Sequence, residues 1–572
     1  MEDLLTRPAP RPPGPSAAPA PELPGGPRRS RPHAPSGIER QWTAIGGRVQ
    51  AGLARATTWR HFDVALLALL AALSLGLRWR ALWTSYWGDE AIAIGIASHS
   101  LGSLPHYLVN DGAPPLYYAM LHYWLQLFGR SAPATHALSM IAALLAIPAA
   151  WWSGDKLFGR RAGRGAAALV ATCAYLDYYS SETRMYSWLV LAAILAVTCF
   201  VLAYRGAGRR YWVAATVLMT AVLYLQYYGL YLLAATVIAG SAAALGRRSW
   251  PHLKATLFYA LACAAAFGPW APQFLYQLQH TGAPWAPHPS ALDFFGDSFN
   301  ALASAAWAAV VVAIAVCVIY RPRPTTLTNR RDWLVSSPIA LAAAVPLITL
   351  LLAWTFGQFV NSWNPRYLGI AVVPALIPLA GALSRARWGT LALWGAVVGL
   401  ACTAVPMVVD RGVTVETSKS DVAYLFSELR PLLHPGALVI SSEVTDTPVL
   451  ALDLGDRFRY ATPFGILSDP LVVNWSDISA RLRDTDAAHD LGPLLRALPI
   501  GGQVLLVNPT SWGGGETPET YAGAVEAEAI AATATVLQDP DLQEEVSERV
   551  PQYSNSLYPM SAILFVKIKP AE

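Results

Sequence analysis

Two adjacent carboxylates, Asp89 and Glu90, follow the first long apolar run of the sequence, at about residues 62 to 82. A run of about 20 apolar residues can cross a bilayer, so the pair is expected at a membrane surface. A carboxylate held there could take the proton from the hydroxyl group of an acceptor. The same dipeptide is common in solvated loops, so other residues must decide between these interpretations.

Two later segments each place an arginine at the edge of an apolar run. Residues 180–186 contain Glu182 and Arg184, and residues 364–368 contain Arg366. An unpaired guanidinium costs roughly 2.5–3.5 kcal/mol at mid-membrane and less near the interface. A phosphate removes most of this cost, because arginine can bind it through two hydrogen bonds. The pattern indicates an anionic substrate; the alternatives are pairing with Glu182, contact with lipid headgroups and snorkelling.

The composition is that of a membrane protein. Of the 572 residues 54% are hydrophobic and only 14% are charged, and the mean hydropathy is +0.36. The net charge is +4, and no basic patch interleaved with aromatic residues indicates binding to nucleic acid. The five cysteines all lie inside apolar runs, so neither disulfides nor a cysteine-ligated metal are expected.

The apolar runs predict about eleven transmembrane helices, beginning near residues 62, 133, 165, 187, 211, 230, 254, 299, 334, 367 and 388. Lysine and arginine gather in alternate turns, which the positive-inside rule assigns to the cytoplasm together with the N-terminus. The outward segments are then residues 83–132, 180–186, 226–229, 272–298 and 355–366, with everything after 410. This topology predicts a multi-pass protein of the cell membrane, with Asp89, Arg184 and Arg366 all on its extracytoplasmic face.

The alternation requires that residues 114–129 do not cross the membrane. This segment is short for a span, and it holds His122, Gln126 and several aromatic residues. We therefore expect a helix in the outer interface, where tyrosine and tryptophan are favoured. A short true span is the alternative.

The two ends of the chain differ from its middle. Residues 1–60 are rich in Pro, Ala, Gly and Arg, which is typical of a disordered tail, here cytoplasmic. The transmembrane domain is predicted over residues 61–410. After it, a helix over 421–433, strand-like runs at 437–441, 503–508 and 562–568, and a helical acidic stretch around 523–548 predict a small extracytoplasmic α/β domain at 411–572. Its role is not indicated.

Taken together, these motifs are similar to those of the GT-C superfamily of membrane glycosyltransferases. The resemblance covers roughly residues 62–410 and is nearest to the bacterial protein-mannosyltransferase and aminoarabinose-transferase-like group, glycosyltransferase family 39. It rests on an ordered set: Asp89-Glu90, Ala113-Pro114-Pro115-Leu116-Tyr117-Tyr118, Ser180-Ser181-Glu182-Thr183-Arg184-Met185-Tyr186 and Arg366-Tyr367. Ala113 stands where many members have histidine, so the contact made by that imidazole is either absent or supplied by Asp111 or His106.

The resemblance implies an inverting transfer of a sugar, with mannose the first choice, from a polyprenyl-phosphate carrier to a hydroxyl acceptor on a glycan, lipid or protein. Asp89 would be the general base, and Arg184 and Arg366 would bind the donor phosphate. Glu90 would bind a sugar hydroxyl or share a divalent ion with Asp89; metal dependence is left open. The further substrate-binding candidates are Asp111, His106, Tyr117, Tyr118, Glu182, Tyr186, Tyr367, His280 and His288.

Two alternatives stay open. Within the same superfamily, the donor sugar could be a pentose or an aminosugar, for example arabinofuranose. In another class, a polyprenyl-phosphate transporter or flippase would need ionisable residues deep within its spans and paired repeats. Most predicted spans carry no charge at mid-depth, and no repeat is evident, so the enzyme is favoured.

Overall fold

The computed structural model describes residues 61–303, 337–385, 393, 397–398, 419–510, 517, 519–549, 556 and 558–570. Residues 63–572 form the second of two units in the chain. Within the second unit we distinguish a helical region, residues 63–398, and a sheet region, residues 419–570. The predicted tail at 1–60 and the predicted domain boundary at 410 lie outside the described residues.

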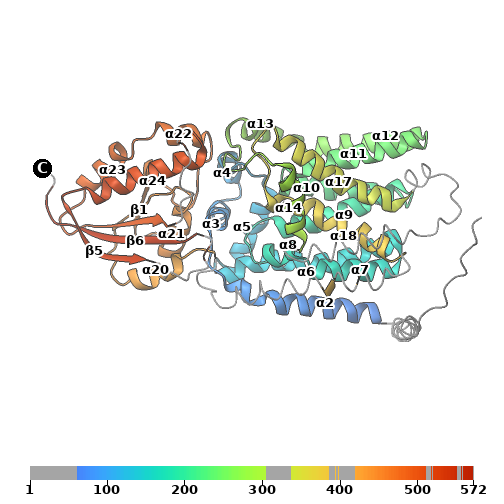
Figure 1. Cartoon of the computed structure of the whole chain (residues 1–572), viewed down its shortest axis with the longest axis horizontal. Helices are drawn as coiled ribbons and strands as arrows, with labels where there is room; N and C mark the ends of the chain where they lie inside the picture. Colours follow the sequence, from blue (N-terminus) through green and yellow to red (C-terminus); the bar gives the residue numbers. More distant parts are fainter. Residues whose placement is uncertain are drawn as a thin grey trace, which may run out of the picture. The chain divides into compact units, whose positions relative to one another are not determined.

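The helical region is a bundle of long helices, and shorter helices lie between them along the chain (Figure 1). Its elements are α2 (Phe62–Arg78), η1 (Trp79–Trp83), α3 (Gly88–Ser98), α4 (Leu104–Asp111), α5 (Leu116–Phe128), α6 (Ala132–Phe158), α7 (Arg160–Ala171), α8 (Ala174–Tyr179), α9 (Tyr186–Tyr204), α10 (Arg209–Leu225), α11 (Gly229–Gly246), α12 (Trp250–Phe267), η2 (Gly268–Trp270), α13 (Ala271–His280), α14 (Ala291–Ala303), α17 (Pro338–Gly357), η4 (Pro365–Tyr367) and α18 (Gly369–Leu383).

Six helices of the described part are long and apolar enough to span a membrane: Phe62–Trp83, Ala132–Phe158, Tyr186–Tyr204, Gly229–Gly246, Trp250–His280 and Pro338–Gly357. They coincide with six of the predicted spans. The runs predicted near 165, 211 and 367 form shorter helices, of 12, 17 and 15 residues in α7, α10 and α18. Those predicted near 299 and 388 lie largely outside the described residues, so the count of eleven is not confirmed.

The segment predicted to lie in the interface forms the 13-residue helix α5. At a rise of 1.5 Å per residue it reaches only about 20 Å, short of the roughly 30 Å hydrocarbon core. A helix of this length agrees with the predicted position in the interface.

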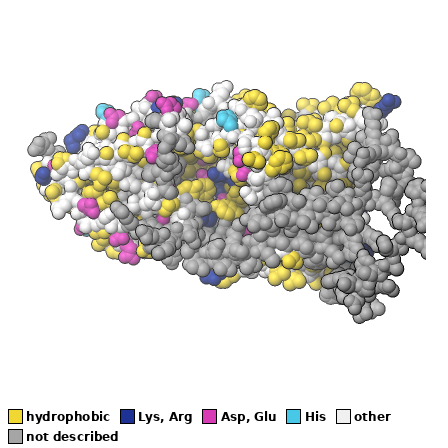
Figure 2. Space-filling model, in the orientation of Figure 1, with side chains coloured by type: hydrophobic (Ala, Val, Ile, Leu, Met, Phe, Trp, Pro, Cys, Tyr) yellow, Lys and Arg dark blue, Asp and Glu magenta, His cyan; other side chains and the backbone are white. Residues whose placement is uncertain are grey.

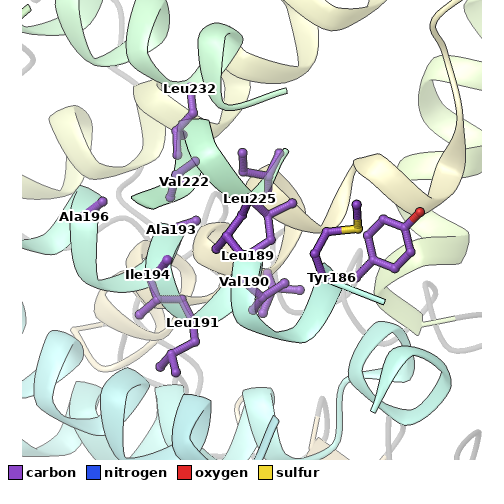
Figure 3. Packing of buried hydrophobic residues seen from close by; sticks show 14 of the residues in the cluster. Tyr186, Leu189, Val190, Leu191, Ala193, Ile194, Ala196, Val222, Leu225 and Leu232 are labelled. Carbon is purple, nitrogen blue, oxygen red and sulfur yellow. The ribbon is translucent and has the colours of Figure 1, made fainter. Parts of the chain in front are cut away.

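Helix α9 lies at the centre of the bundle. In the most apolar 18-residue stretch of α9, 89% of the residues are buried, whereas the corresponding share in the first span is 11%. An all-round apolar helix is expected in such a position, because it has no polar face to expose. Figure 3 shows Leu189 and Ala193 of α9 packed beside Val222 and Leu225 of α10 and Leu232 of α11.

The face of α11 and α12 carries mostly hydrophobic side chains, whereas charged side chains gather over the sheet region (Figure 2). Leu245, Phe258 and Leu261 are among the exposed apolar residues of these two helices. Exposed apolar surface of this kind is expected where lipid replaces water as the solvent.

Helices α6 and α7 approach closely through two glycines. A Cβ atom on Gly163 would lie 2.6 Å from the carbonyl oxygen of Trp151, and one on Gly154 would lie 2.8 Å from that of Ala162. Small residues at helix contacts allow backbones to approach in membranes, where packing replaces the hydrophobic effect between helices.

Among its described residues, the sheet region holds six strands in the order β3-β2-β1-β4-β6-β5. Its helices are α20 (Val422–Leu429), α21 (Thr447–Leu454), α22 (Ile478–Asp484), α23 (Ala487–Arg496) and α24 (Tyr521–Leu537), and its strands are β1 (Leu438–Ser441), β2 (Arg459–Thr462), β3 (Gly465–Ile466), β4 (Gln503–Pro509), β5 (Leu542–Arg549) and β6 (Met560–Lys567). Strand β1 pairs in parallel with β2 and β4, whereas β6 pairs antiparallel with β4 and β5. The sheet is therefore mixed.

Alternate residues of the central strands face opposite layers. Val439 and Leu505 pack with α20 and α21 on one face, and Ile440 and Leu506 pack with α23 and α24 on the other, as Figure 1 also shows. This arrangement follows from the two-residue period of a strand and the apolar runs at 437–441 and 503–508.

The prediction of a continuous acidic helix around 523–548 is wrong in its second half. Helix α24 ends at Leu537, and Leu542–Arg549 forms strand β5. This strand lies at the edge of the sheet, where charged side chains are favoured because they discourage pairing with another chain.

We expect Gly163→Ala to lower the thermal stability of the detergent-solubilised protein. The new methyl group would press on the backbone of α6, and overpacking of this kind costs about 1–3 kcal/mol. Gly76→Ala is the matched control, because it adds the same methyl on helix α2 where nothing lies within 4 Å. Equal melting temperatures for the two variants would contradict the close α6–α7 contact.

Candidate active site

Three residues far apart in the sequence converge on one point. Asp89 lies in the first turn of α3, Arg184 in the turn between α8 and α9, and Arg366 in η4. The Arg366 Nη1 atom lies 2.5 Å from Asp89 Oδ2, and Arg184 Nη2 lies 3.7 Å from the same oxygen. Arg184 Nη1 also donates to the Asp89 carbonyl at 3.2 Å. We call these three residues the charged triad.

Local contacts fix the direction of Arg366. The Asn364 side-chain oxygen accepts from the Arg366 backbone N–H at 3.1 Å and from its Nε at 3.2 Å. The guanidinium lies over the ring of Trp87, 5.3 Å from its centroid, a favourable cation–π arrangement. The hydroxyl of Tyr175 donates to the Arg366 carbonyl at 2.5 Å.

The charged triad has more positive than negative charge. Burial alone would lower the pKa of Arg184 and of Arg366, but the Asp89 carboxylate outweighs it and holds both pKa values well above the ordinary range. Both arginines therefore stay cationic, and one carboxylate faces two guanidinium groups. Two neighbouring guanidinium groups are suited to bind a phosphate group.

Glu90 does not join the triad, although it is next to Asp89. Its side chain is fully buried, and its oxygens accept from Lys419 Nζ at 2.9 Å, from His136 Nε2 at 2.8 Å and from the Thr183 backbone N–H at 2.7 Å. Burial alone would raise the pKa of Glu90, but Lys419 and His136 lower it to about 2. Glu90 is thus ionised and enclosed by protein.

Lys419 was not among the predicted site residues. Its ammonium also donates to the Ser181 carbonyl at 2.5 Å, and its side chain is only 4% exposed. It lies 329 residues from Glu90 in the sequence, and no local pattern links the two. His136 did carry a signal, as an ionisable residue near the start of a predicted span.

A cavity of about 510 Å³ opens beside the triad. Four of the predicted residues line this cavity: Asp89, Asp111, Arg184 and Tyr367. Its other walls are mostly apolar or aromatic and include Tyr227, Tyr228, Leu230, Phe274, Trp285, Leu352 and Phe356. A larger hollow of about 620 Å³, lined by Tyr86, Arg130 and Asp453 among others, contains none of the triad. We therefore base the site on the cavity that does.

Asp111 is held within the cavity by Tyr118, whose hydroxyl donates to Asp111 Oδ2 at 2.7 Å. Burial raises the pKa of Asp111 to about 6, in spite of the nearby Arg184. Asp111 is thus able to gain or lose a proton close to neutral pH.

A second, smaller cavity of about 200 Å³ is lined by Trp87, Tyr178, Tyr179, Glu182, Arg366 and Tyr558. Glu182 is 1% exposed. Neither of its carboxylate oxygens has a hydrogen-bond partner in the described part of the chain. Burial raises the pKa of Glu182 to about 7. The alternative of an internal Arg184–Glu182 pair therefore has no support, because Arg184 pairs with Asp89.

The remaining predicted residues lie outside both cavities. His106 is exposed at the surface of α4. His280 pairs with Asp477 at 3.0 Å, and Nδ1 of His288 contacts the Gly357 carbonyl oxygen at 2.9 Å. Tyr117 and Tyr186 are fully buried, and the Arg184 guanidinium lies 6.0 Å from the Tyr186 ring centroid. The structure therefore gives none of the three histidines a place in the candidate site.

The carboxylates of Asp89 and Glu90 face different partners, so the geometry does not support a metal site shared by the two. The Glu90 carboxylate is enclosed by Lys419 and His136, whereas Asp89 faces the two arginines. Among the residues that the structure describes, no group of three His, Cys, Asp or Glu side chains could hold a metal ion.

Comparisons with known proteins agree with this fold. The family model described as dolichyl-phosphate-mannose-protein mannosyltransferase matches residues 112–272. The crystal structure of ArnT from Cupriavidus metallidurans in the apo state is similar with a TM-score of 0.58 and 13% identity, over 88% of this chain and 98% of that one. ArnT from the same organism bound to undecaprenyl phosphate gives 0.55 and 13% over the same shares. No curated protein sequence matches significantly. The predicted resemblance to the GT-C superfamily is confirmed, and the chain has a membrane GT-C fold.

We expect Lys419→Met to destabilise the protein by about 3–5 kcal/mol, because it leaves the buried Glu90 carboxylate uncompensated. The double variant Glu90→Gln/Lys419→Met should recover much of this loss in equilibrium unfolding measurements in mixed micelles.

Since the folded pKa of Glu90 is depressed to about 2, the ion pair between Glu90 and Lys419 stabilises the protein at pH values above the ordinary glutamate pKa. That stability is lost as pH falls towards 2, and the double variant should lack this pH dependence.

Proposed function

We propose that this protein is a glycosyltransferase that moves a sugar from a polyprenyl-phosphate carrier to a hydroxyl acceptor. The observation that carries the proposal is the charged triad beside a mostly apolar cavity: Asp89 contacts both Arg184 and Arg366, and Asp89 and Arg184 line the cavity. The family model and the similar fold of a structure with bound undecaprenyl phosphate support the same donor class.

The two arginines are proposed to bind the phosphate of the carrier. A phosphate oxygen would take the place that the Asp89 carboxylate now holds between the guanidinium groups, and it would free an Asp89 oxygen for the acceptor. As the bond from the anomeric carbon to the phosphate oxygen breaks, the leaving phosphate gains charge. Arg184 and Arg366 would stabilise this charge. The apolar walls near Leu230 and Phe356 suit the first isoprene units.

Asp89 is proposed as the general base. It would accept the proton of the acceptor hydroxyl while that oxygen forms a bond to the anomeric carbon, and the phosphate would leave with the electron pair from the opposite face. The products are the glycosylated acceptor with inverted configuration and the polyprenyl phosphate. Mannose is the first choice of sugar, on the description of the family model; a pentose or an aminosugar is the alternative.

Glu90 is proposed to position the site rather than to contact substrate. Through the Thr183 backbone N–H it holds the turn that carries Arg184. In the proposed topology this site and the sheet region face the extracytoplasmic side of the cell membrane, where the acceptor would be found.

We expect Asp89→Asn to lower kcat by roughly 100-fold or more, because the amide cannot take up the proton. The measurement is transfer from radiolabelled polyprenyl-phosphate-mannose to membrane acceptors by the purified protein. Asp453→Asn is the control, since it removes a carboxylate paired with Arg430 in the sheet region. Full activity of Asp89→Asn, or no transfer from any carrier-linked sugar by the unaltered protein, would refute the proposal.

We expect Arg184→Gln to weaken binding of undecaprenyl phosphate roughly tenfold or more, because a charge-assisted contact to the phosphate is lost. Binding can be followed by native mass spectrometry of the detergent-solubilised protein. Arg130→Gln is a matched control at an exposed position away from the triad. Equal affinities of the two variants would remove the phosphate role from Arg184.

A further inference from the structure

The smaller cavity holds a carboxylate for which the proposed reaction has no use. Glu182 is 1% exposed, and both of its oxygens lack a hydrogen-bond partner among the residues described. A buried carboxylate without partners costs free energy. A ligand that donates hydrogen bonds to it would remove that cost.

The other walls of this cavity are aromatic and come from three parts of the chain. Trp87 precedes α3, Tyr178 and Tyr179 belong to α8, and Tyr558 belongs to the sheet region. The Trp87 and Tyr558 rings are stacked, 5.4 Å apart and inclined by 10°. Aromatic faces offer apolar contact area at low cost in conformational entropy, which suits the C–H face of a sugar ring, while hydroxyl groups would turn towards Glu182.

The small cavity is connected to the proposed phosphate site through Arg366. Arg366 lines the small cavity, and its ion-pair partner Asp89 lines the larger one. The turn at 180–185 carries both acidic and basic groups, and it directs Glu182 into the small cavity and Arg184 into the large one. A glycosyl phosphate has a matching polarity, with an anionic end and a ring that bears hydroxyl groups.

We propose that the cavity between Trp87, Tyr178, Tyr179 and Tyr558 binds a monosaccharide ring, and that Glu182 accepts hydrogen bonds from its hydroxyl groups. The inference rests on the proposed function, since it makes this cavity the sugar subsite next to the phosphate site. The raised pKa of Glu182, about 7 through burial, agrees with a group whose partner is supplied by the ligand.

The test compares binding of bare undecaprenyl phosphate with binding of undecaprenyl phosphates that carry mannose, glucose, arabinofuranose or aminoarabinose. The unaltered protein should bind at least one glycosylated lipid about tenfold more tightly than the bare lipid. Glu182→Gln should remove this preference and leave the affinity for the bare lipid unchanged. Since no protein partner of Glu182 is lost, the variant should keep its melting temperature.

A second variant, Tyr558→Ala, opens the cavity from the sheet region and should also reduce the preference, whereas Tyr123→Ala, at an exposed position on α5, should not. If the ring belongs to the acceptor instead, Glu182→Gln will leave the donor preference intact and raise the KM for the acceptor about tenfold. If neither the donor preference nor the acceptor KM changes, the sugar subsite is wrong. Loss of bare-lipid binding in Arg184→Gln tests the phosphate site separately, so the two proposals fail independently.

Discussion

The buried ion pair between Glu90 and Lys419 joins α3, the sheet region and the turn that carries Glu182 and Arg184. Glu90 lies in the first turn of α3, Lys419 leads into the sheet region, and both contact that turn, through the Thr183 N–H and the Ser181 carbonyl. A buried charge is tolerated only when it is paired and hydrogen-bonded. The sheet region must therefore sit against α3 for the arginine turn to keep its position, and fold and site depend on the same contact.

Adjacent carboxylates acquire different roles because they lie on a helix. Successive residues of an α-helix point about 100° apart, since there are 3.6 residues per turn. Asp89 consequently faces the two arginines, while Glu90 faces Lys419 and His136. Both lie in the first turn of α3, where the helix dipole favours negative charge. Gly88 lets the sheet region approach this turn, because a Cβ atom there would lie 2.8 Å from the Thr445 carbonyl oxygen.

The same division recurs in the turn at 180–185. Glu182 and Arg184 are two residues apart, yet each lines a different cavity. The ion pair between Arg366 and Asp89 joins a residue that lines the small cavity to one that lines the large cavity. One cavity is mostly apolar and the other is aromatic with a carboxylate, so the ion pair links two chemically different spaces. An amphiphilic glycosyl lipid phosphate has the same two parts joined at a phosphate, which is why the arrangement suits the proposed donor.

The sequence by itself determined the membrane class, six of the spans, three strand runs of the sheet (β1, β4 and β6) and the positions of Asp89, Arg184 and Arg366 at the ends of apolar runs. These features are local, because hydrophobic length and charge can be read within a window of about 20 residues. Only the tertiary structure decided that Glu90 is enclosed by Lys419, that Glu182 lines a second cavity with no hydrogen-bond partner among the described residues, and that the acidic segment Leu542–Arg549 is an edge strand paired with β6. Each of these depends on a partner brought from a distant part of the chain, and the long-range packing that selects such partners leaves no periodic signal in the sequence.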